Sequence, residues 1–297
     1  MTLIQTLRDR YRPWSAAGTT AAGEEAPSKP SAQATAAPAV CPAEASAAEA
    51  PLPAKPVLES AGHCTTCDRN VTFVARNAWL RDHFACSNCG SIPRERALMA
   101  VIESYFPNWR ELVIHESSPG NRGASLRLRQ QCAGYIPSQF FPGEAPGSVV
   151  GGMRCENLEA LALADESVDL HVTQDVMEHV FHPERAFREI ARTLRAGGAH
   201  ICTVPLVNKT RPSRRRARLL ADGQIEHLEP AVYHGNPISE EGSLVTVDWG
   251  FDICRHIFDA CGLFTQIVQI DDLSRGIRAE YIEVLVTLKP PALKFTL

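Results

Sequence analysis

The segment from residue 165 to residue 205 constrains the fold more than any other part of this 297-residue sequence. Apolar and polar residues alternate over 168–173, which predicts a β-strand. Apolar residues then repeat at helical spacing over 183–194, and a glycine pair separates this helix from a second apolar strand over 200–204. A strand, a helix and a strand in this order predict two parallel neighbours in an open α/β sheet.

Two polar residues, Gln174 and Asp175, follow the first of these strands. Polar groups at the carboxyl end of a parallel strand lie where open α/β sheets bind ligands. A short helix is expected over 177–180, and Asp is also a residue type that caps the start of a helix. A ligand contact and a helix cap are therefore both open to Asp175.

This segment resembles the second half of the S-adenosylmethionine-dependent methyltransferase fold. The resemblance is carried by Asp165, Ser167, Asp169-Leu170, Asp175-Val176, Glu178-His179, Phe187-Arg188-Glu189-Ile190, Leu194, Gly197-Gly198 and Val204-Pro205. It implies a doubly wound α/β fold with a mostly parallel sheet whose last strand is antiparallel, and S-adenosyl-L-methionine as the cofactor. Two strands predicted over 264–270 and 281–288, joined as a hairpin, complete that sheet.

The sequence divides into four predicted parts. Residues 1–14 form a short N-terminal peptide, and 15–60 form an Ala/Pro-rich linker with too few large apolar side chains to fold. A small zinc ribbon is predicted over 61–92. The methyltransferase domain is predicted over 93–297, with a polar insertion at 206–248 that is too long to lack structure or function.

Four of the ten cysteines form two C-x-x-C pairs, Cys64 with Cys67 and Cys86 with Cys89, and 18 residues separate the pairs. This spacing matches the four-thiolate zinc pattern, and a shell of four thiolates leaves no open coordination position. A structural Zn²⁺ ion is therefore predicted. Charges between the pairs are mixed, so we expect the ribbon to brace or cover the catalytic domain, with nucleic-acid reading as the alternative.

Methyltransferases of this fold usually have an acidic, glycine-rich turn after the first strand, where the backbone approaches the cofactor closely. The corresponding turn spans 115–123 and keeps only Gly120 and Gly123 of the glycine set. Ser138-Gln139 stand where the family usually has an acid for the ribose hydroxyls. The resemblance places these residues at the cofactor: Glu116, Ser117, Gly120, Ser138, Gln139, Glu156, Asn157, Leu158, Gln174 and Asp175.

Methyl transfer to an oxygen benefits from a general base, and histidine changes its charge near neutral pH. The insertion contains His227 and His234, and His179 follows the strand over 168–173. These three histidines are the predicted catalytic residues, and a structural hydrogen bond is the alternative role for each. Six basic residues over 209–218 form either a solvated helix or a phosphate-binding cluster.

A narrower resemblance links the chain to zinc-ribbon methyltransferases that occur with bacterial glycan and glycosyltransferase enzymes. It is carried by Cys86-Ser87-Asn88-Cys89-Gly90-Ser91, Arg94-Glu95-Arg96, His115-Glu116-Ser117 and Tyr233-His234-Gly235-Asn236-Pro237. It implies O-methylation of a glycan, a nucleotide sugar or another small hydroxylated acceptor, with a glycosyltransferase as a candidate partner. Two alternatives remain: an RNA methyltransferase that uses the ribbon and the arginine cluster, and a non-catalytic scaffold in a glycosyltransferase complex.

The composition of the chain bears on the cellular compartment in which we expect the protein. The net charge of −4 argues neither for nor against a nucleic-acid partner, and no apolar run reaches the roughly 20 residues that span a bilayer. The N-terminal residues are too charged for a secretory signal, and a metal-type cysteine array suits a reducing compartment. We therefore expect a cytoplasmic protein without a membrane span.

Overall fold

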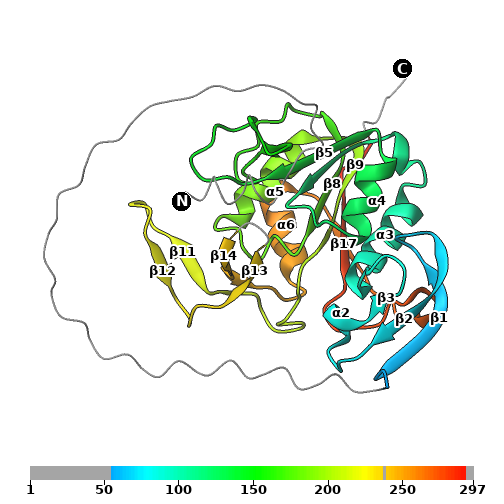
Figure 1. The fold of residues 1–297 in the computed structure, drawn as a ribbon. Coiled ribbons are helices and arrows are strands. Elements are labelled where there is room, and N and C mark those ends of the chain that lie inside the picture. The colour runs from blue at the N-terminus through cyan, green and yellow to red at the C-terminus, as the bar shows by residue number, and fades with distance from the viewer. Residues whose placement is uncertain (1–54, 237–238, 292–297) are drawn as a thin grey trace, which may run out of the picture. The chain divides into compact units, whose positions relative to one another are not determined.

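The computed structural model describes residues 55–236 and 239–291 (Figure 1). The predicted peptide 1–14 and most of the predicted linker 15–60 lie outside the described residues. Within the described ranges, every helix is too short or too polar to cross a bilayer.

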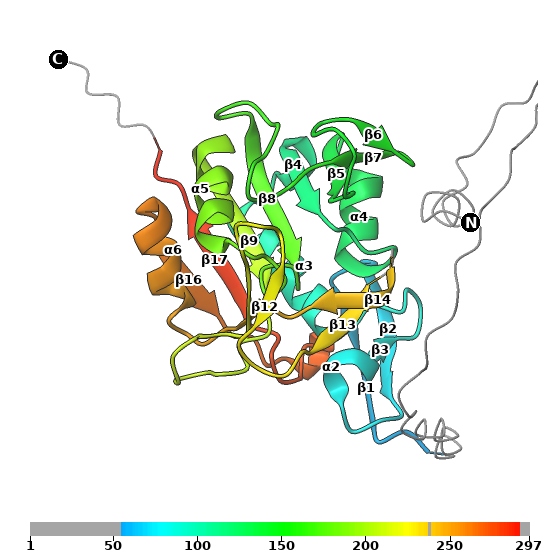
Figure 2. The ribbon, with the colours of Figure 1, turned by 90° about the vertical axis from the view of Figure 1, so that its left-hand side faces the viewer.

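The centre of the fold is an eight-stranded sheet with the order β16-β17-β9-β8-β4-β5-β7-β6 (Figure 2). Its strands are β4 (Val113–Ser117), β5 (Gly134–Gln139), β6 (Val149–Val150), β7 (Met153–Cys155), β8 (Val168–Gln174), β9 (Leu194–Thr203), β16 (Thr265–Val268) and β17 (Val284–Leu288). Strands β7, β5, β4, β8 and β9 are parallel, whereas β17 is antiparallel to both of its neighbours. The predicted doubly wound, mostly parallel sheet with an antiparallel last strand is confirmed.

Two pairs of helices cover the two faces of this sheet. The helices are α3 (Pro93–Tyr105), α4 (Gly123–Gln131), α5 (Pro183–Thr193) and α6 (Ile253–Cys261). Helices α3 and α4 lie on one face, and α5 and α6 lie on the other (Figure 1). Because successive strand residues point to opposite faces, Val284 packs in the core with Leu98 whereas Leu285 packs with Phe187.

A smaller antiparallel sheet precedes α3. It consists of β1 (Leu58–Cys64), β2 (Arg69–Ala75) and β3 (Ala85–Cys86), with the short helix α2 (Leu80–His83) before β3. The Sγ atoms of the four predicted metal ligands lie together in it, as the predicted ribbon requires. Its core is formed by the rings of Phe73 and Phe84, whose centroids are 5.8 Å apart.

Arg96 of α3 ties this ribbon to the larger sheet's domain. Its guanidinium is buried and donates to the carbonyl oxygens of Phe84 at 2.7 Å and Gly276 at 2.6 Å. The same group lies 4.6 Å from the ring centroid of Phe73. Gly276 has a φ of 65°, and a Cβ atom there would lie 2.6 Å from the Phe73 ring. The ribbon, α3 and the turn at 273–276 therefore share one tightly packed interface.

The insertion folds as short antiparallel strand pairs. These are β10 (Arg214–Arg215) with β15 (Val247–Asp248), β11 (Ala217–Leu219) with β12 (Ile225–His227), and β13 (Tyr233–Asn236) with β14 (Ser239–Leu244). The interpretation of 209–218 as a solvated helix is wrong, because β10 and β11 occupy this stretch. Arg216 pairs with Asp248 at 2.8 Å and Arg218 pairs with Glu226, so contacts between strands stabilise the extended backbone.

The helix expected over 177–180 is also absent, and an irregular turn follows β8. Asp175 has a φ of 52°, whereas a helix cap normally has an extended backbone. The backbone N–H of Thr246 donates to the Glu178 carbonyl at 2.7 Å, and the Thr246 hydroxyl donates to the Val180 carbonyl at 2.7 Å. The insertion thus satisfies carbonyl groups of this turn, and the helix-cap role of Asp175 is excluded.

Candidate cofactor and acceptor site

The candidate site lies at the carboxyl ends of β4 and β8. The chain leaves β4 towards β5 and β7, and later returns to β8 on the other side of β4. Open α/β sheets bind ligands where the strand order reverses in this way. Ser117 and Thr173 are paired at this edge, so Gln174 and Asp175 follow directly beside the end of β4.

Glu116 organises this edge from inside the protein. Its buried Oε1 accepts hydrogen bonds from the Ser125 hydroxyl at 2.6 Å and the Gln174 amide at 2.8 Å. Its Oε2 accepts from the Tyr135 hydroxyl at 2.7 Å. Burial raises the pKa of Glu116 despite these three donors. The predicted acidic residue therefore positions Gln174 and Ser125 and does not itself reach the exposed edge.

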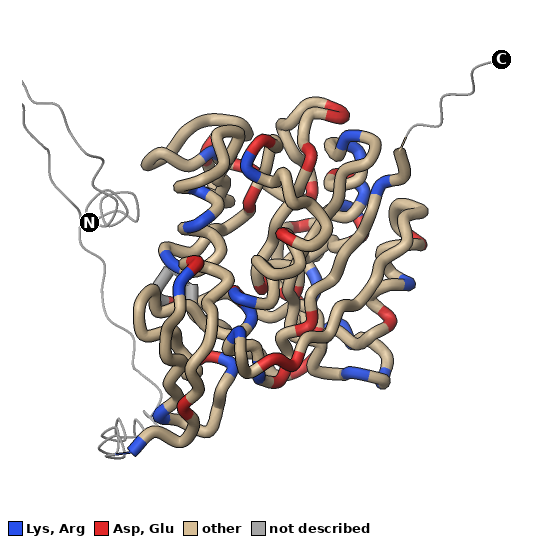
Figure 3. The backbone as a smooth tube through the Cα atoms, turned by 90° about the vertical axis from the view of Figure 1, so that its right-hand side faces the viewer, with Lys and Arg blue, Asp and Glu red and all other residues tan. Residues whose placement is uncertain are grey.

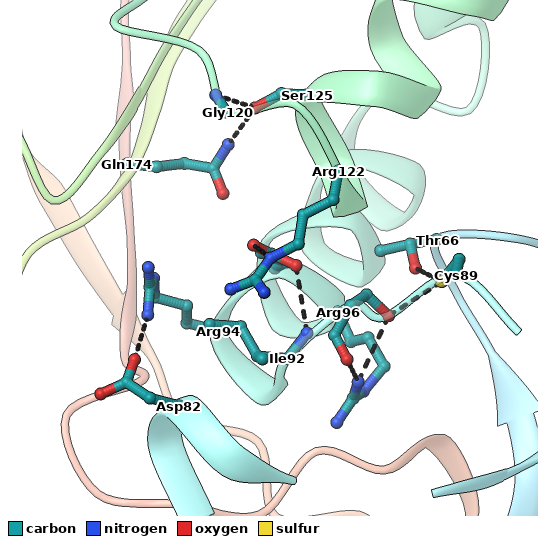
Figure 4. Close-up of polar contacts among 12 residues, drawn as sticks. Thr66, Asp82, Cys89, Ile92, Arg94, Arg96, Gly120, Arg122, Ser125 and Gln174 are labelled. Atoms are coloured by element: carbon teal, nitrogen blue, oxygen red, sulfur yellow. Dashed lines mark hydrogen bonds and ion pairs between the residues drawn. The ribbon is translucent and has the colours of Figure 1, made fainter. Parts of the chain in front are cut away.

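The loop after β4 is held by the same network (Figure 4). The Ser125 hydroxyl accepts from the backbone N–H of Gly120 at 3.0 Å and from the Gln174 amide at 2.9 Å. Gly120 is exposed, and a Cβ atom there would meet only Ser125, at 3.7 Å. Ser118 has a φ of 54°, a conformation that glycine adopts more easily. The loop thus presents exposed backbone at Gly120, although it has Ser118 at a position whose conformation favours glycine.

Gly123 is needed for packing within the protein and not for contact with a ligand. A Cβ atom at this position would lie 2.2 Å from Oε2 of Glu95, and Gly123 has a φ of 56°. The Glu95 carboxylate accepts from the Ile92 backbone N–H at 3.0 Å and from Arg122 at 3.1 Å. The second glycine of the loop therefore makes room for α3 and leaves no space for a ligand.

The remaining predicted cofactor residues fall into two groups. Gln139, Asn157 and Gln174 are half-buried and follow or end β5, β7 and β8 at the same edge of the sheet. Amide side chains both donate and accept hydrogen bonds, so these three residues suit a ligand that carries hydroxyl and amino groups.

The other predicted side chains point into the protein. The Ser138 hydroxyl lies 2.7 Å from Nε2 of the buried His115. Glu156 is buried and accepts from the Ala162 backbone N–H at 2.7 Å. Leu158 belongs to the apolar core beneath α5 and α6, and Ser117 is buried at the end of β4. These side chains are buried beneath the edge of the sheet and support its backbone.

Asp175 is held by two arginines that the sequence did not single out as functional. Its Oδ2 lies 2.6 Å from Nη2 of Arg81 and 3.1 Å from Nε of Arg94, and the Thr203 hydroxyl donates to Oδ1 at 3.1 Å. Burial acts to raise the pKa of Asp175, but the two guanidinium groups outweigh it and lower the pKa. Arg81 belongs to α2, so the ribbon contributes a side chain to this edge.

Two of the three predicted catalytic histidines come together. The rings of His179 and His234 are perpendicular, with centroids 5.2 Å apart. Oε1 of the buried Glu178 lies 3.7 Å from Nε2 of His179 and 3.8 Å from Nδ1 of His234. His227 lies exposed on β12, opposite Ala217, and does not belong to this cluster. The insertion therefore brings one histidine, His234, to the turn after β8.

The cysteine quartet has the geometry of a closed metal site. The Sγ atoms of Cys64 and Cys89 are 3.8 Å apart, and those of Cys67 and Cys86 are 3.9 Å apart. All four sulfurs lie within 4.8 Å of one another. A tetrahedral shell with Zn–S bonds of about 2.3 Å places its sulfurs about 3.8 Å apart. The four thiols therefore fit a single Zn²⁺ ion.

Four of the six basic residues over 209–218 already have acidic partners. They form five ion pairs: Lys209 with Glu280, Arg214 with Glu229 and with Asp248, Arg216 with Asp248, and Arg218 with Glu226. Figure 3 shows basic and acidic segments interleaved along the described chain. Carboxylates of the protein thus take up much of the charge that a phosphate group would need.

Residues 141–202 match the family model described as a methyltransferase domain. This match covers β6 to β9, including the return of the chain to the centre of the sheet. No curated protein matches the sequence.

Several solved methyltransferase structures are similar to this chain, at low identity and low TM-score. An S-adenosylmethionine-dependent methyltransferase from Mesorhizobium loti is 15% identical, with a TM-score of 0.39, and the alignment covers 65% of this chain and 97% of that one. A chain from the complex of the Haloferax volcanii Trm112 methyltransferase activator with a methyltransferase is 17% identical, with a TM-score of 0.43 and coverages of 68% and 92%. A Burkholderia thailandensis 1,6-didemethyltoxoflavin-N1-methyltransferase with bound S-adenosylhomocysteine is 13% identical, with a TM-score of 0.39 and coverages of 66% and 78%.

Proposed function

We propose that this chain is an S-adenosylmethionine-dependent methyltransferase that methylates a hydroxyl group of a small acceptor, such as a glycan or a nucleotide sugar. The observation that carries the proposal is the Glu116 network. It fixes the Gln174 amide and the Gly120 backbone side by side at the point where the strand order reverses. The methyltransferase-domain match over residues 141–202 supports the same activity.

The residues at this edge fit the cofactor in the pose that its fold implies. The exposed backbone at Gly120 suits the methionine part, the Gln139 amide suits the ribose hydroxyls, and Asn157 suits the adenine. Bound S-adenosylmethionine supplies a methyl group activated by its positively charged sulfur. Gln174, locked by Glu116 and Ser125, marks the side from which the acceptor approaches.

The acceptor side is formed by Glu178, His179 and His234. As the methyl carbon leaves sulfur and bonds to the acceptor oxygen, that oxygen loses its proton. The two imidazoles and the carboxylate lie where they can assist this loss, and the insertion that carries His234 can shield the reaction from water. Transfer to a hydroxylated acceptor is the chemistry that uses this cluster.

We also propose that the cysteine quartet holds one structural Zn²⁺ ion. The spacing of its four sulfurs fits a tetrahedral shell, and such a shell leaves no position for a substrate. The ribbon would then act as a brace that delivers Arg81 to Asp175.

Calorimetric titration of the full chain with S-adenosylhomocysteine tests the cofactor site. We expect one molecule bound per chain and at least tenfold weaker binding by Gln174→Ala. Gln131→Ala is the matched control, because Gln131 is exposed at the end of α4 and contacts Arg110. No binding by the wild type would exclude both methyltransferase hypotheses and leave the scaffold role.

Methyl-transfer assays with separate sets of nucleotide sugars, free glycans and RNA test the acceptor. Product S-adenosylhomocysteine is expected with a hydroxylated sugar acceptor. Turnover with RNA alone would overturn the proposed acceptor class.

A further inference from the structure

We propose that Glu178, His179 and His234 form a second metal site, which binds a divalent transition-metal ion such as Zn²⁺ through two imidazole nitrogens and one carboxylate oxygen. One donor atom from each residue lies within 4.8 Å of the other two. The site is separate from the cysteine quartet in both its residues and its ligand chemistry. It adds a bound cation to the acceptor side of the cleft.

Glu178 is the buried member of the cluster, and its carboxylate makes no hydrogen bond among the described residues. Its side chain is 2% exposed. The nearest basic nitrogens are those of His179 and His234, at 3.7 and 3.8 Å, beyond hydrogen-bonding distance. A buried carboxylate without a hydrogen bond is destabilising, and a cation coordinated beside it would compensate its charge.

His179 is oriented as metal-binding histidines are. Its Nδ1 lies 2.8 Å from the backbone carbonyl of Leu244, which can only accept a hydrogen bond. Nδ1 therefore carries a proton, and in the neutral ring it is Nε2, which faces Glu178, that presents the lone pair. Histidine ligands commonly have the second ring nitrogen fixed by such a carbonyl contact.

The backbone around the cluster is fixed by the insertion. The Glu178 carbonyl accepts from the Thr246 backbone N–H at 2.7 Å and from the Thr246 hydroxyl at 3.0 Å. His234 pairs with Ser243 in the β13–β14 hairpin, so it reaches Glu178 from a strand pair. Three ligands from two fixed segments meet the need of a metal site for preorganised donors.

The distances fit a small cation after a modest closure. Ligands bound at about 2.0–2.1 Å lie roughly 3–3.4 Å apart. The separations of 3.7 and 3.8 Å exceed this range by less than 1 Å. The His234 side chain is 43% exposed, so its ring can turn towards Glu178 without disturbing the core.

The chemistry of the donors selects the type of ion. Imidazole suits Zn, Cu, Fe and Ni, whereas Mg²⁺ and Ca²⁺ prefer oxygen ligands. Three protein ligands also leave a position for water or substrate, in contrast to the closed cysteine site. If the proposed methyl transfer holds, an acceptor hydroxyl would take this position and lose its proton more readily beside the cation.

Metal content and cobalt spectroscopy test the site independently of catalysis. The full chain is loaded with Zn²⁺ or Co²⁺, desalted, and analysed for bound metal per chain. We expect two ions in the wild type and one in both Glu178→Gln and His234→Ala, whose remaining cobalt retains the charge-transfer bands of thiolate ligation. His227→Ala is the matched control, since this exposed histidine of the same insertion lies outside the cluster and should leave two ions bound.

Two results would overturn the second site: one ion per wild-type chain with thiolate bands only, or two ions in both cluster variants. Circular dichroism of each variant verifies that it is folded. Titration with S-adenosylhomocysteine separates this proposal from the proposed function. Loss of a metal ion in the variants with no cofactor binding by the wild type would support the metal site and refute the methyltransferase.

Discussion

At the scale of single residues, Asp175 has the most demanding environment at the candidate site. Its carboxylate faces Arg81 of the ribbon and Arg94 of α3, while its backbone adopts a left-handed conformation with a φ of 52°. Asn, like Asp, tolerates that conformation. The charge of this residue can therefore be removed without changing the course of the chain.

Asp175→Asn should lower the free energy of unfolding by about 3 kcal/mol, because two largely buried guanidinium groups lose their shared carboxylate. Urea denaturation at neutral pH measures the change. Asp82→Asn serves as the control: Asp82 also contacts Arg94, but its side chain is 43% exposed, so its loss should cost less than about 1 kcal/mol. Equal effects of the two substitutions would contradict the assigned role of Asp175.

Glu116→Gln tests whether the loop depends on the buried network. A glutamine presents one acceptor oxygen where the hydroxyls of Ser125 and Tyr135 and the amide of Gln174 all donate. At least one donor is left unsatisfied, which costs about 1–3 kcal/mol. We expect a lower melting temperature and roughly tenfold weaker binding of S-adenosylhomocysteine by calorimetry.

The exposed Glu111 gives the control for loss of charge alone, as Glu111→Gln. Wild-type affinity and melting temperature in Glu116→Gln would show that the network does not support the cofactor loop.

At the scale of elements, the central strands are joined by histidines within the core. Nδ1 of His115 in β4 lies 2.9 Å from Nδ1 of His171 in β8, and Nε2 of His171 lies 2.7 Å from the Thr193 hydroxyl. The Thr193 hydroxyl donates to the carbonyl of Glu189, so it accepts from His171 Nε2. His171 Nδ1 then accepts from His115, and both rings are neutral.

Acidification should destabilise this sheet at pH values well above those at which carboxylates usually bind protons. Burial, with a contribution from Arg154, lowers the pKa of His115 to about 4; burial, with His115 nearby, lowers that of His200 to about 3 and that of His171 well below its usual value. Below about pH 6.5 the unfolded chain binds protons that the folded chain refuses, so stability falls as the pH falls.

Between pH 7.5 and pH 5.5 these three histidines should together cost about 4 kcal/mol of unfolding free energy. Urea denaturation at the two pH values measures the loss. In His200→Gln about one third of it should disappear, because one titrating group is removed. Identical stability of the wild type at both pH values would refute the neutral core network.

Sequence patterns predicted elements well where local and tertiary preferences agree. Helix α5 spans Pro183–Thr193, close to the predicted 183–194, because Pro183 begins it and its apolar residues face one core. The predicted helices over 177–180 and 209–218 do not form, because their backbone groups and arginines bond to distant partners such as Thr246 and Asp248. Contacts with such distant partners produce no periodic pattern in the sequence from which they could be predicted.

At the candidate site, too, the sequence predicted features that depend on local spacing and missed contacts between distant residues. Two C-x-x-C pairs are local, so the quartet could be identified from spacing alone. The pairing of His179 with His234 depends on how the insertion folds back, and the contact of Arg81 with Asp175 joins residues 94 positions apart. Arg81 stood among mixed charges in the ribbon, and nothing in the sequence distinguished it from its neighbours.

At the scale of the whole molecule, the ribbon is a structural part of the candidate site. Arg96 joins its core to the turn at 273–276, and Arg81 extends from it to Asp175. A structural zinc site supplies folding free energy that its small sheet cannot obtain from burial alone. Loss of a metal ion from the ribbon should therefore change the position of Arg81 and weaken cofactor binding at the edge of the sheet.

If the cysteine quartet holds Zn²⁺ as proposed, loss of that ion should lower the melting temperature of the full chain and weaken S-adenosylhomocysteine binding. Cys67→Ser is the targeted variant, because general chelation would also empty the proposed histidine site. Circular dichroism and calorimetry give the two readouts, with Cys261→Ser as the control cysteine on α6. A melting temperature lowered without any change in binding would show that the ribbon is not coupled to the cleft.

The insertion leaves and rejoins the domain at neighbouring points, since Lys209 and Gly250 form an isolated bridge. It contributes His234 to the proposed acceptor side, whereas the residues of the Glu116 network lie in the sheet and α4. A segment anchored in this way can be exchanged or rebuilt with little effect on the sheet. Related chains could thus acquire new acceptors by changing one loop, and grafting that loop between them would transfer acceptor preference while cofactor affinity stays the same.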